Sequence, residues 1–482
     1  MMIISRGSGR LWIRKSVLVT LLQASVYLTL LPNCLAQVTT DTPTYKRIKK
    51  KLDAVRAIDT HDHLFPFDRL PGFRETAEGR GMNVAGIWGN SYWQQVGTLT
   101  AWKPRMKFDA WWKDAHDDWD DSRATSFYRY TQIALQDLYG VDWDRVTAPE
   151  AVELDRRIFA NYQDETWLQD VITKRANIEL MFNDPYWGRY SFETTYPFEV
   201  LVFNITPLVR GFHASEFDNP LDSPYEFARR HGMAIDSLDD LLKVIDRLFL
   251  EARDKGAVCL KSTLAYQRTL RFEDVPKSRA EVAFGKRRTV LSEKEIKDFE
   301  DFIFWRICQL SARYELPFQI HTGHGRLQGS NPMLLVDMIE ANPKTKFILF
   351  HGGYPWTGET GAILLRHWRH VWIDSVWLPQ LSYSMAKRAY HEWLEQMPST
   401  RIMWGGDCNH AEGIYGSTEL TRRCLAEVLA EKVDRGDLRE ADADRIGHQI
   451  LRQNALDLFP QLKTRLTAAR QNAPRTVSGS GR

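Results

Sequence analysis

The stretch SEKEIKDFEDFIFWRICQLSARYELPFQIHTGHG, residues 292–325, contains one complete helix-to-strand step of the pattern that decides the fold. Ser292 and Glu295 form a capping box, which predicts the start of a helix. Apolar residues then recur at helical spacing at Ile296, Phe299, Ile303, Ile307 and Leu310. The apolar run Pro317–His321 follows and predicts a short buried strand that ends in a histidine.

Eight segments of the chain predict strands in this pattern. They are Ala57–His61, Ile178–Phe182, Val200–Pro207, Ala257–Lys261, Pro317–His321, Lys346–His351, Val371–Asp374 and Arg401–Gly405. Helical patterns separate the later strands; Leu238–Phe249, for example, carries apolar residues at helical spacing. Strands that alternate with helices run parallel, so eight such units predict an α/β fold, a closed (β/α)8 TIM-like barrel.

Residues 64–175 interrupt this alternation after the first strand. The segment is rich in tryptophan, and its patterns are mainly helical, as in Ala148–Tyr162. Large aromatic side chains mostly build cores, although they also line pockets. We therefore expect a Trp-rich helical insertion that covers one end of the barrel.

The N-terminus has the pattern of an export signal. A basic segment precedes the apolar run Ser16–Leu31, and Ala36 offers a small residue for cleavage before Gln37. We therefore expect a signal peptide over residues 1–36 and export to the periplasm or the outside of the cell. An uncleaved anchor, or a cytosolic protein with an overlong start, is the alternative.

The other boundaries and the partners follow from pattern and composition. Residues 37–56 predict a linker and an N-terminal helix, 57–462 the barrel with its insertion, and 463–482 a disordered tail. Lys and Arg number 64 against 62 Asp and Glu, so the formal charge of +2 gives no reason to expect nucleic acid. We expect a small-molecule substrate, no membrane span after signal removal, and a fold compatible with a homo-oligomer. The four cysteines beyond residue 36 form no CxxC motif and predict buried thiols, although export would permit one disulfide.

Polar residues close five of the eight predicted strands. In a barrel of this kind the working residues stand at the carboxyl ends of the strands. A His-x-His pair ends the first strand, a lysine the fourth, and two histidines and an aspartate end three later strands. These residues are His61, His63, Lys261, His321, His351 and Asp407. Five such endings argue for one shared site rather than for chance.

The His-x-His pair indicates a metal site. Residues two apart on a strand face the same side, so His61 and His63 can reach one ion. Neutral imidazoles suit zinc and its neighbours in the transition series, and an aspartate such as Asp407 can complete the site while a position stays open for water. The expected cofactor is therefore a divalent metal ion, with zinc favoured over manganese or iron.

Several motifs resemble a known family. Asp59-Thr60-His61-Asp62-His63 resembles the opening strand of the amidohydrolase superfamily. The more specific stretches are Leu260–Tyr266, Leu316–Gly325, Ser330–Pro332 and Phe350–Pro355. Together they resemble the amidohydrolase-related (amidohydrolase 2) branch that contains the amidohydrolase-like part of FluG and nodulin-type proteins and, more distantly, uronate isomerase and metal-dependent decarboxylases. The resemblance covers residues 55–460.

The resemblance implies a metal-bearing barrel that commonly hydrolyses bonds. By position it makes His61, His63, His321 and Asp407 ligands, and His351 a further ligand or a catalytic neighbour. Some amidohydrolases carry a carboxylated lysine that bridges two metals at the place of Lys261. The sequence around Lys261 is more similar to the branch with one metal, where an ammonium would bind a substrate carboxylate; a purely structural lysine is the third reading.

The expected chemistry starts from the ion. A bound divalent cation lowers the pKa of its water from 15.7 to about 7. Asp407 can then accept the proton of that water, and His351 can polarise the scissile carbonyl. Four residues just beyond strand ends are candidates for substrate contact, and an arginine among them suits a carboxylate. They are Tyr266, His324, Arg326 and Tyr354, with Arg210 in a similar position.

These observations predict a metal-dependent hydrolase in which a metal-bound water attacks a C–N or C–O bond. The substrate would be a small amide, lactone or ester that carries a carboxylate. A decarboxylase or sugar-acid isomerase on the same scaffold is the nearest alternative. A binding protein that retains the barrel without catalysis is the alternative of another class.

Overall fold

A computed structural model describes residues 38–92 and 100–472 of the 482-residue chain. The expected signal peptide, residues 1–36, and the last ten residues of the expected tail, 473–482, lie outside the described residues. Among the described residues, no helix is long and apolar enough to cross a membrane.

Eight parallel strands form the centre of the molecule, in the order of the sequence. They are β1 (Ala57–Asp62), β4 (Ile178–Asn183), β5 (Glu199–Asn204), β6 (Cys259–Ser262), β7 (Phe318–Ile320), β8 (Phe347–Leu349), β9 (Val371–Asp374) and β10 (Ile402–Met403). Main-chain hydrogen bonds from Thr60 N–H to the Trp404 carbonyl (3.2 Å) and from Asp407 N–H to the His61 carbonyl (2.8 Å) join the last strand to the first. The sheet therefore closes, and the predicted (β/α)8 barrel is confirmed.

Four strands end earlier than the sequence predicted; Pro317–His321 ends at Ile320 and Arg401–Gly405 at Met403, and the other two show a physical reason. The strand expected over Val200–Pro207 ends at Asn204, whose side-chain oxygen accepts the N–H of Thr206 at 3.0 Å and starts helix α8. The strand expected over Lys346–His351 ends at Leu349 because His351 has a left-handed φ of 58°. In both cases a polar residue at the strand end turns the chain out of the sheet and into the mouth of the barrel.

Helices surround the barrel, and α12 begins at the predicted capping box of Ser292 and Glu295. The helices outside the insertion are α2 (Pro43–Asp53), α8 (Thr206–Val209), α9 (Pro224–Arg230), α10 (Leu238–Asp254), α11 (Lys277–Ala280), α12 (Glu293–Tyr314), α13 (Val336–Ala341), α14 (Thr357–His367), α15 (Leu378–Leu381), α16 (Tyr383–Gln396), α17 (Ala411–Asp434), α18 (Glu440–His448), α19 (Asn454–Leu458) and α20 (Gln461–Asn472). The apolar stripe of α12 is buried against the sheet, as its spacing predicted.

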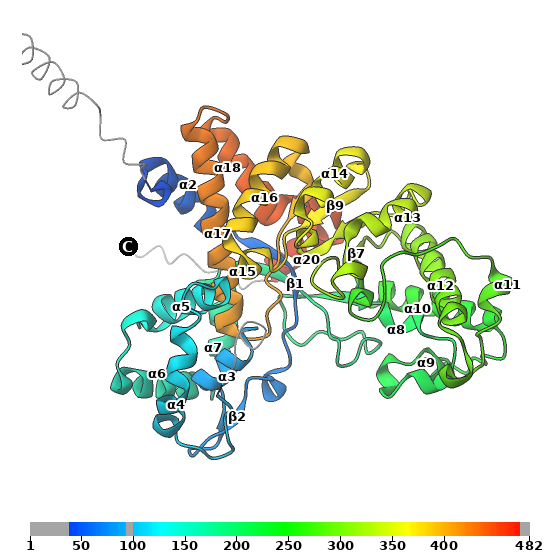
Figure 1. Cartoon of the computed structure of the whole chain (residues 1–482), viewed down its shortest axis with the longest axis horizontal. Coiled ribbons are helices and arrows are strands. Elements are labelled where there is room, and N and C mark those ends of the chain that lie inside the picture. Colours follow the sequence, from blue (N-terminus) through cyan, green and yellow to red (C-terminus); the bar gives the residue numbers. More distant parts are fainter. Residues whose placement is uncertain (1–37, 93–99, 473–482) are drawn as a thin grey trace, which may run out of the picture.

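The segment after β1 is the expected helical insertion. Its helices are α3 (Val84–Gly89), α4 (Phe108–Asp120), α5 (Ser126–Tyr139), α6 (Ala148–Asn161) and α7 (Glu165–Asp170), with a small antiparallel pair, β2 (Arg74–Glu75) and β3 (Arg80–Gly81). The tryptophans Trp88, Trp111, Trp112, Trp119 and Trp143 are buried and form its core. Figure 1 shows these helices gathered to one side of the barrel, where α5 packs along α17.

The expectation of a disordered tail from residue 463 is wrong at its start. Residues Gln461–Asn472 form α20, because Leu462 and Leu466 bury their side chains and Arg465 donates to the Pro197 carbonyl at 2.9 Å. The one disulfide that export would permit is absent from the described residues. Cys259, Cys308, Cys408 and Cys424 are all free and buried, which agrees with the prediction of buried thiols.

Candidate metal centre

Four histidines and one aspartate meet at the carboxyl ends of the barrel strands. Nε2 of His63 lies 3.2 Å from Oδ1 of Asp407, and Nε2 of His61 lies 3.7 Å from the same oxygen. Nε2 of His351 lies 2.9 Å from Nδ1 of His321, and Nδ1 of His351 lies 4.0 Å from Oδ2 of Asp407. The structure therefore brings together the five residues that the sequence proposed as ligands.

The backbone explains how these side chains converge. His61 and His63 stand two positions apart at the end of β1, so their rings point to the same side, 4.7 Å apart between centroids. His351 and Asp407 each have a φ of 58°, a left-handed conformation that non-glycine residues rarely adopt. Such strain persists where surrounding contacts enforce it, and it clusters at functional sites.

Hydrogen bonds fix the orientation of two of the rings. Nδ1 of His63 faces the Asp184 carbonyl at 3.0 Å, and Nδ1 of His351 faces the Val376 carbonyl at 3.1 Å. A carbonyl only accepts, so each Nδ1 is the donor and each Nε2 of a neutral ring keeps its lone pair. The lone pair of His63 then faces Asp407, an arrangement of two acceptors that a cation between them would satisfy.

The electrostatics of the histidines also fit a metal. Burial lowers the pKa of His61 and His321 well below the ordinary value and lowers that of His351 to about 3. These rings therefore stay neutral and keep the lone pairs that a metal needs. Among the described residues, Nδ1 of His61 and Nε2 of His321 are buried without a hydrogen-bond partner. A buried polar atom without a partner is costly, and a bound cation would supply one.

Asp407 is ionised in this setting. Burial alone would raise its pKa, but the hydrogen bond and the charge of His63, with smaller contributions from His351 and Lys261, lower it to about 2. For His63, burial acts to lower the pKa, but Asp407 outweighs it and the pKa is raised. An ionised Asp407 beside the neutral rings of His61, His321 and His351 is the combination that a divalent cation binds, and a cation would take the place of the proton that Asp407 favours on His63.

Lys261 reaches the same centre from β6. Its Nζ lies 3.1 Å from Nε2 of His61 and 3.9 Å from the centre of the Phe350 ring. Burial lowers the pKa of Lys261 to about 8, although the carboxylates of Asp184, Asp407 and Asp374 oppose this shift. The acidic surroundings that a buried lysine requires are therefore present.

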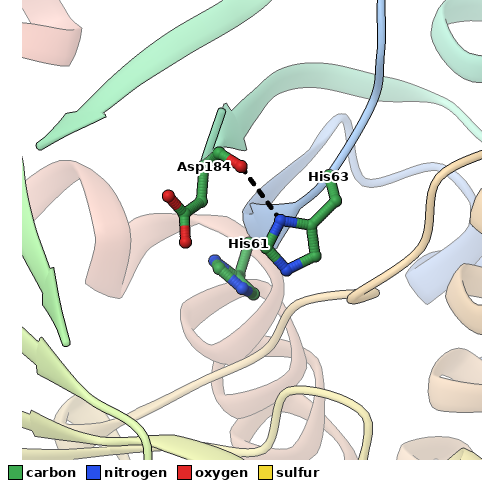
Figure 2. Close-up of side chains that lie close together, drawn as sticks. All are labelled: His61, His63 and Asp184. Atoms are coloured by element: carbon green, nitrogen blue, oxygen red, sulfur yellow. Dashed lines mark hydrogen bonds between the residues drawn. The ribbon is translucent and has the colours of Figure 1, made fainter. Parts of the chain in front are cut away.

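Asp184 belongs to the centre and was not among the residues proposed from the sequence. Ligand atoms of His61, His63 and Asp184 all lie within 4.8 Å of one another (Figure 2). Both carboxylate oxygens of Asp184 accept from Nδ2 of Asn204, at 3.1 and 3.0 Å. Asp184 directly follows β4, so the strand-end argument that selected Asp407 would have selected it too.

Other buried carboxyls beneath the centre were also missed. Asp59 and Asp62 flank His61 on β1, and Asp374 ends β9; all three are fully buried. Burial raises the pKa of Asp59 and of Asp374 to about 7. Asp374 closes a predicted strand, so the strand-end argument applies to it as well, whereas Asp59 lies inside β1 and carries no such signal.

Of the expected substrate-contact residues, Tyr266 contacts the centre directly, and His324 and Tyr354 lie beyond it, next to Trp377 and to each other. The Tyr266 ring lies 4.4 Å from the His321 ring and is 53% exposed, so it stands at the entrance. The His324 ring lies 5.0 Å from the Trp377 ring and 6.2 Å from the Tyr354 ring.

Arg326 does not join them. Its Nη1 donates to the Gln267 carbonyl at 2.9 Å, and it lines a separate cavity of about 460 Å³ together with Arg210 and Arg288. The chain turns at Gly325, where a Cβ would meet the Ala265 carbonyl at 2.4 Å, and this turn carries Arg326 away from the histidines.

Residues 283–461 match the sequence model of the amidohydrolase family. Protein FluG of Emericella nidulans is 31% identical over 168 residues, which cover 34% of this chain and 19% of FluG. The chain thus aligns with about a fifth of that relative. Among solved structures, a protein of Lactobacillus casei described as a candidate metal-dependent hydrolase is 17% identical with a TM-score of 0.58, over 86% of this chain and 98% of the other. Glucuronate isomerase of Caulobacter crescentus is 14% identical with a TM-score of 0.66, over 87% and 95%.

At these identities the solved structures establish the shared barrel alone. The sequence match is independent of them and covers the segment that carries His321, His351 and Asp407. Together with the histidines that meet at the strand ends, these findings support the assignment of the chain to the amidohydrolase superfamily.

Proposed function

We propose that the chain is an exported metal-dependent hydrolase that cleaves a C–N or C–O bond in a small substrate bearing a carboxylate. One observation carries the proposal: four imidazoles and the Asp407 carboxylate meet at the barrel mouth, three of the rings neutral through burial. The hydrolase name of the similar Lactobacillus casei barrel supports it.

The residues divide the work as follows. His61, His63, His321 and Asp407 hold a divalent cation, with zinc favoured by the imidazole-rich set and His351 beside it. A bound cation supplies Lewis acidity and makes a nearby water acidic enough to attack near neutral pH. Asp407, whose low pKa makes it a weak base on its own, accepts the proton once the water is acidified. Lys261 offers a buried positive charge to the substrate carboxylate.

The deciding experiment combines elemental analysis with an activity screen. The purified protein should contain one or more zinc ions per chain and should cleave a member of a panel of small amides, lactones and esters of carboxylic acids. Chelator should abolish the activity, and added zinc should restore it. In water labelled with ¹⁸O, the label should enter the product acid.

Isomerisation of a sugar acid is the second candidate, because glucuronate isomerase has a similar barrel over 95% of its length. Uronates carry the carboxylate that Lys261 would bind. A product with the mass of the substrate and no ¹⁸O would replace hydrolysis with this function. Ligand binding that survives replacement of both His61 and Asp407, without turnover of any substrate, would favour a binding protein.

Export rests on the N-terminal sequence alone. N-terminal sequencing of the protein recovered from the native cell envelope or medium should begin at Gln37. A mature protein that retains residues 16–31 and stays in the cytosol would overturn this part of the proposal.

A further inference from the structure

Asp407 lies in a short segment, residues 406–408, in which every main-chain N–H and carbonyl group has a hydrogen-bond partner. Residues 406–408 follow β10, and Asp407 has the left-handed φ of 58°. Gly405 and Gly406 precede it, so the chain on this side has little intrinsic stiffness. The conformation of Asp407 must therefore be imposed by its contacts rather than by local preference.

Six hydrogen bonds from the surroundings impose it, and Cys408 Sγ adds a longer one within the segment, to the Gly406 carbonyl at 3.4 Å. The carboxylates of Asp59 and Asp62 accept the N–H groups of Gly406 (3.1 Å) and Cys408 (2.6 Å). The N–H of Asp407 donates to the His61 carbonyl at 2.8 Å, and the N–H of His63 donates to the Cys408 carbonyl at 2.8 Å. Two carbonyls remain, and side chains from outside β1 take them: Gln380 Nε2 donates to Gly406 at 2.9 Å, and Tyr92 Oη donates to Asp407 at 2.8 Å.

Tyr92 is the member of this set that does not belong to the barrel. It lies in the insertion, just beyond α3, and its ring packs 4.6 Å from the ring of Trp377. The Trp377 ring also lies 5.8 Å from the His351 ring, and the main-chain N–H of Trp377 donates to the Gly405 carbonyl at 3.2 Å. Tyr92 of the insertion thus contacts the segment of Asp407 in two ways. Its hydroxyl donates to the Asp407 carbonyl, and its ring packs on Trp377, which is itself hydrogen-bonded to Gly405.

We propose that Tyr92 is a positioning residue by which the insertion holds Asp407 in its left-handed conformation and keeps its carboxylate on the metal. The Tyr92 hydroxyl is the donor to the Asp407 carbonyl. Without it that carbonyl loses its partner, the segment relaxes toward ordinary φ values, and the carboxylate moves away from His61 and His63. The inference rests on the proposed metal site at Asp407, and it adds a role for the insertion that the barrel residues do not supply.

Tyr92→Phe tests the inference, because it keeps the ring on Trp377 and removes the hydroxyl alone. The probe is Zn²⁺, titrated into metal-free full-length protein in competition with a chromogenic chelator. Partners outside the ligand shell typically change metal affinity or activity by about 10- to 100-fold, so we expect zinc affinity to fall at least about tenfold. With any substrate that the wild type turns over, kcat should fall while KM changes little, since Tyr92 acts on Asp407 rather than on the substrate.

Tyr139→Phe is the matched control. Tyr139 is a buried tyrosine of the same insertion, and its hydroxyl donates to Glu412 at 2.6 Å, not to the segment of Asp407. Its loss should lower the melting temperature and leave zinc affinity unchanged. Gln380→Leu removes the neighbouring donor to Gly406 and should weaken zinc binding in the same direction as Tyr92→Phe.

The outcomes separate this inference from the proposed function. Wild type that binds zinc, with Tyr92→Phe binding it equally well, would overturn the positioning role and leave the metal site intact. An equal loss of zinc affinity in Tyr139→Phe would overturn it too, because the effect would then be one of general stability. Wild type that binds no divalent ion would overturn the proposed function and this inference with it. A crystal structure of Tyr92→Phe in which Asp407 adopts a negative φ would confirm the mechanism.

Discussion

The amine of Lys261 lies 3.1 Å from Nε2 of His61, inside the cluster of side chains that we assign to the metal. A positive charge at this distance repels any cation bound by His61, and three carboxylates surround the pair to offset it. The Lys261 amine therefore either moves away from His61 when a metal binds or stays in the site and contacts the substrate with its positive charge. The two roles differ in what the loss of the lysine does to metal content.

Replacement of Lys261 with methionine should preserve metal content and lower kcat/KM. The side chain keeps its length and loses its charge, so the repulsion of the metal disappears while the contact to the substrate carboxylate is lost. Loss of a hydrogen bond to a charged group typically costs about 1.5–3 kcal/mol, which is about a 10- to 150-fold fall in kcat/KM, mainly through a raised KM. The measurement is zinc per chain by elemental analysis, together with turnover. A fall from two ions to one would contradict this prediction and assign Lys261 as a bridging ligand.

Replacement of Asp184 with asparagine should weaken metal binding. Its carboxylate belongs to a group of possible ligands with His61 and His63, whose ligand atoms all lie within 4.8 Å of one another. The loss of its charge should lower zinc affinity by about tenfold or more, while the hydrogen bond of His63 to the Asp184 main chain remains. Zinc retention on dialysis against a weak chelator measures the effect, with His116→Ala, an exposed histidine of α4, as control. Unchanged retention would place Asp184 outside the ligand set.

Glu199 should make stability depend on pH. Burial raises the pKa of this fully buried residue of β5 from 4.5 to about 7, despite its hydrogen bonds to main-chain N–H groups and Asn183. The folded protein thus holds a proton that the unfolded chain releases above pH 4.5. The contribution of Glu199 to the free energy of unfolding is therefore fully present below pH 4.5 and is lost as the pH rises to about 7.

We therefore expect Glu199→Gln to become more stable relative to wild type as the pH rises. The change in relative free energy of unfolding between pH 4.5 and pH 8 should be on the order of 1–3 kcal/mol. Denaturant unfolding of both proteins at several pH values measures it. Parallel stability curves for the two proteins would show that Glu199 ionises normally in the fold.

Replacement of Gly416 with alanine should loosen the insertion. Gly416 lies in α17 where α5 crosses it, and a Cβ there would meet the Tyr130 carbonyl at 2.3 Å. Overpacking against backbone typically costs about 1–3 kcal/mol. Gly358→Ala in α14, where nothing lies within 4 Å of the added Cβ, is the matched control and should raise stability by up to about 1 kcal/mol. Thermal unfolding distinguishes the two, and equal behaviour would contradict the tight contact of α5 with α17.

The barrel could be predicted from the sequence because each strand is an apolar run followed by a helix pattern. Val371–Asp374 was predicted to the residue, while the strands at Val200 and Lys346 were too long because polar side chains at their ends bend the chain. The ligand candidates at Asp407 and His351 followed from strand ends in the same way. Asp184 lies two positions beyond the predicted strand Ile178–Phe182, because β4 continues to Asn183, and the same reasoning applies to it once the strand end is placed there.

Other features of the site depend on contacts that no local pattern records. Tyr92 lies in a helical insertion and reaches Asp407 across more than 300 positions of sequence. Arg326 follows His324 closely, yet the turn at Gly325 directs it to a different cavity. Leu462 and Leu466 extend the helical part of the chain because they find apolar neighbours, which composition alone could not indicate.

Closure of the barrel between β1 and β10 completes the proposed metal site, so folding and metal binding are coupled. His61 and His63 come from the first strand of the barrel and Asp407 from the segment after the last, so the complete set of proposed ligands exists only when these two ends of the sheet meet. An early chain that offers His61, His63 and Asp184 alone would bind the proposed ion less tightly than the closed barrel. Free metal in excess of its dissociation constant would then favour the finished state over every unfinished one, by about 2.7 kcal/mol at a hundredfold excess. Tight binding of zinc would accordingly indicate a completely folded molecule, and weak binding or none would indicate chains in which the barrel has not closed.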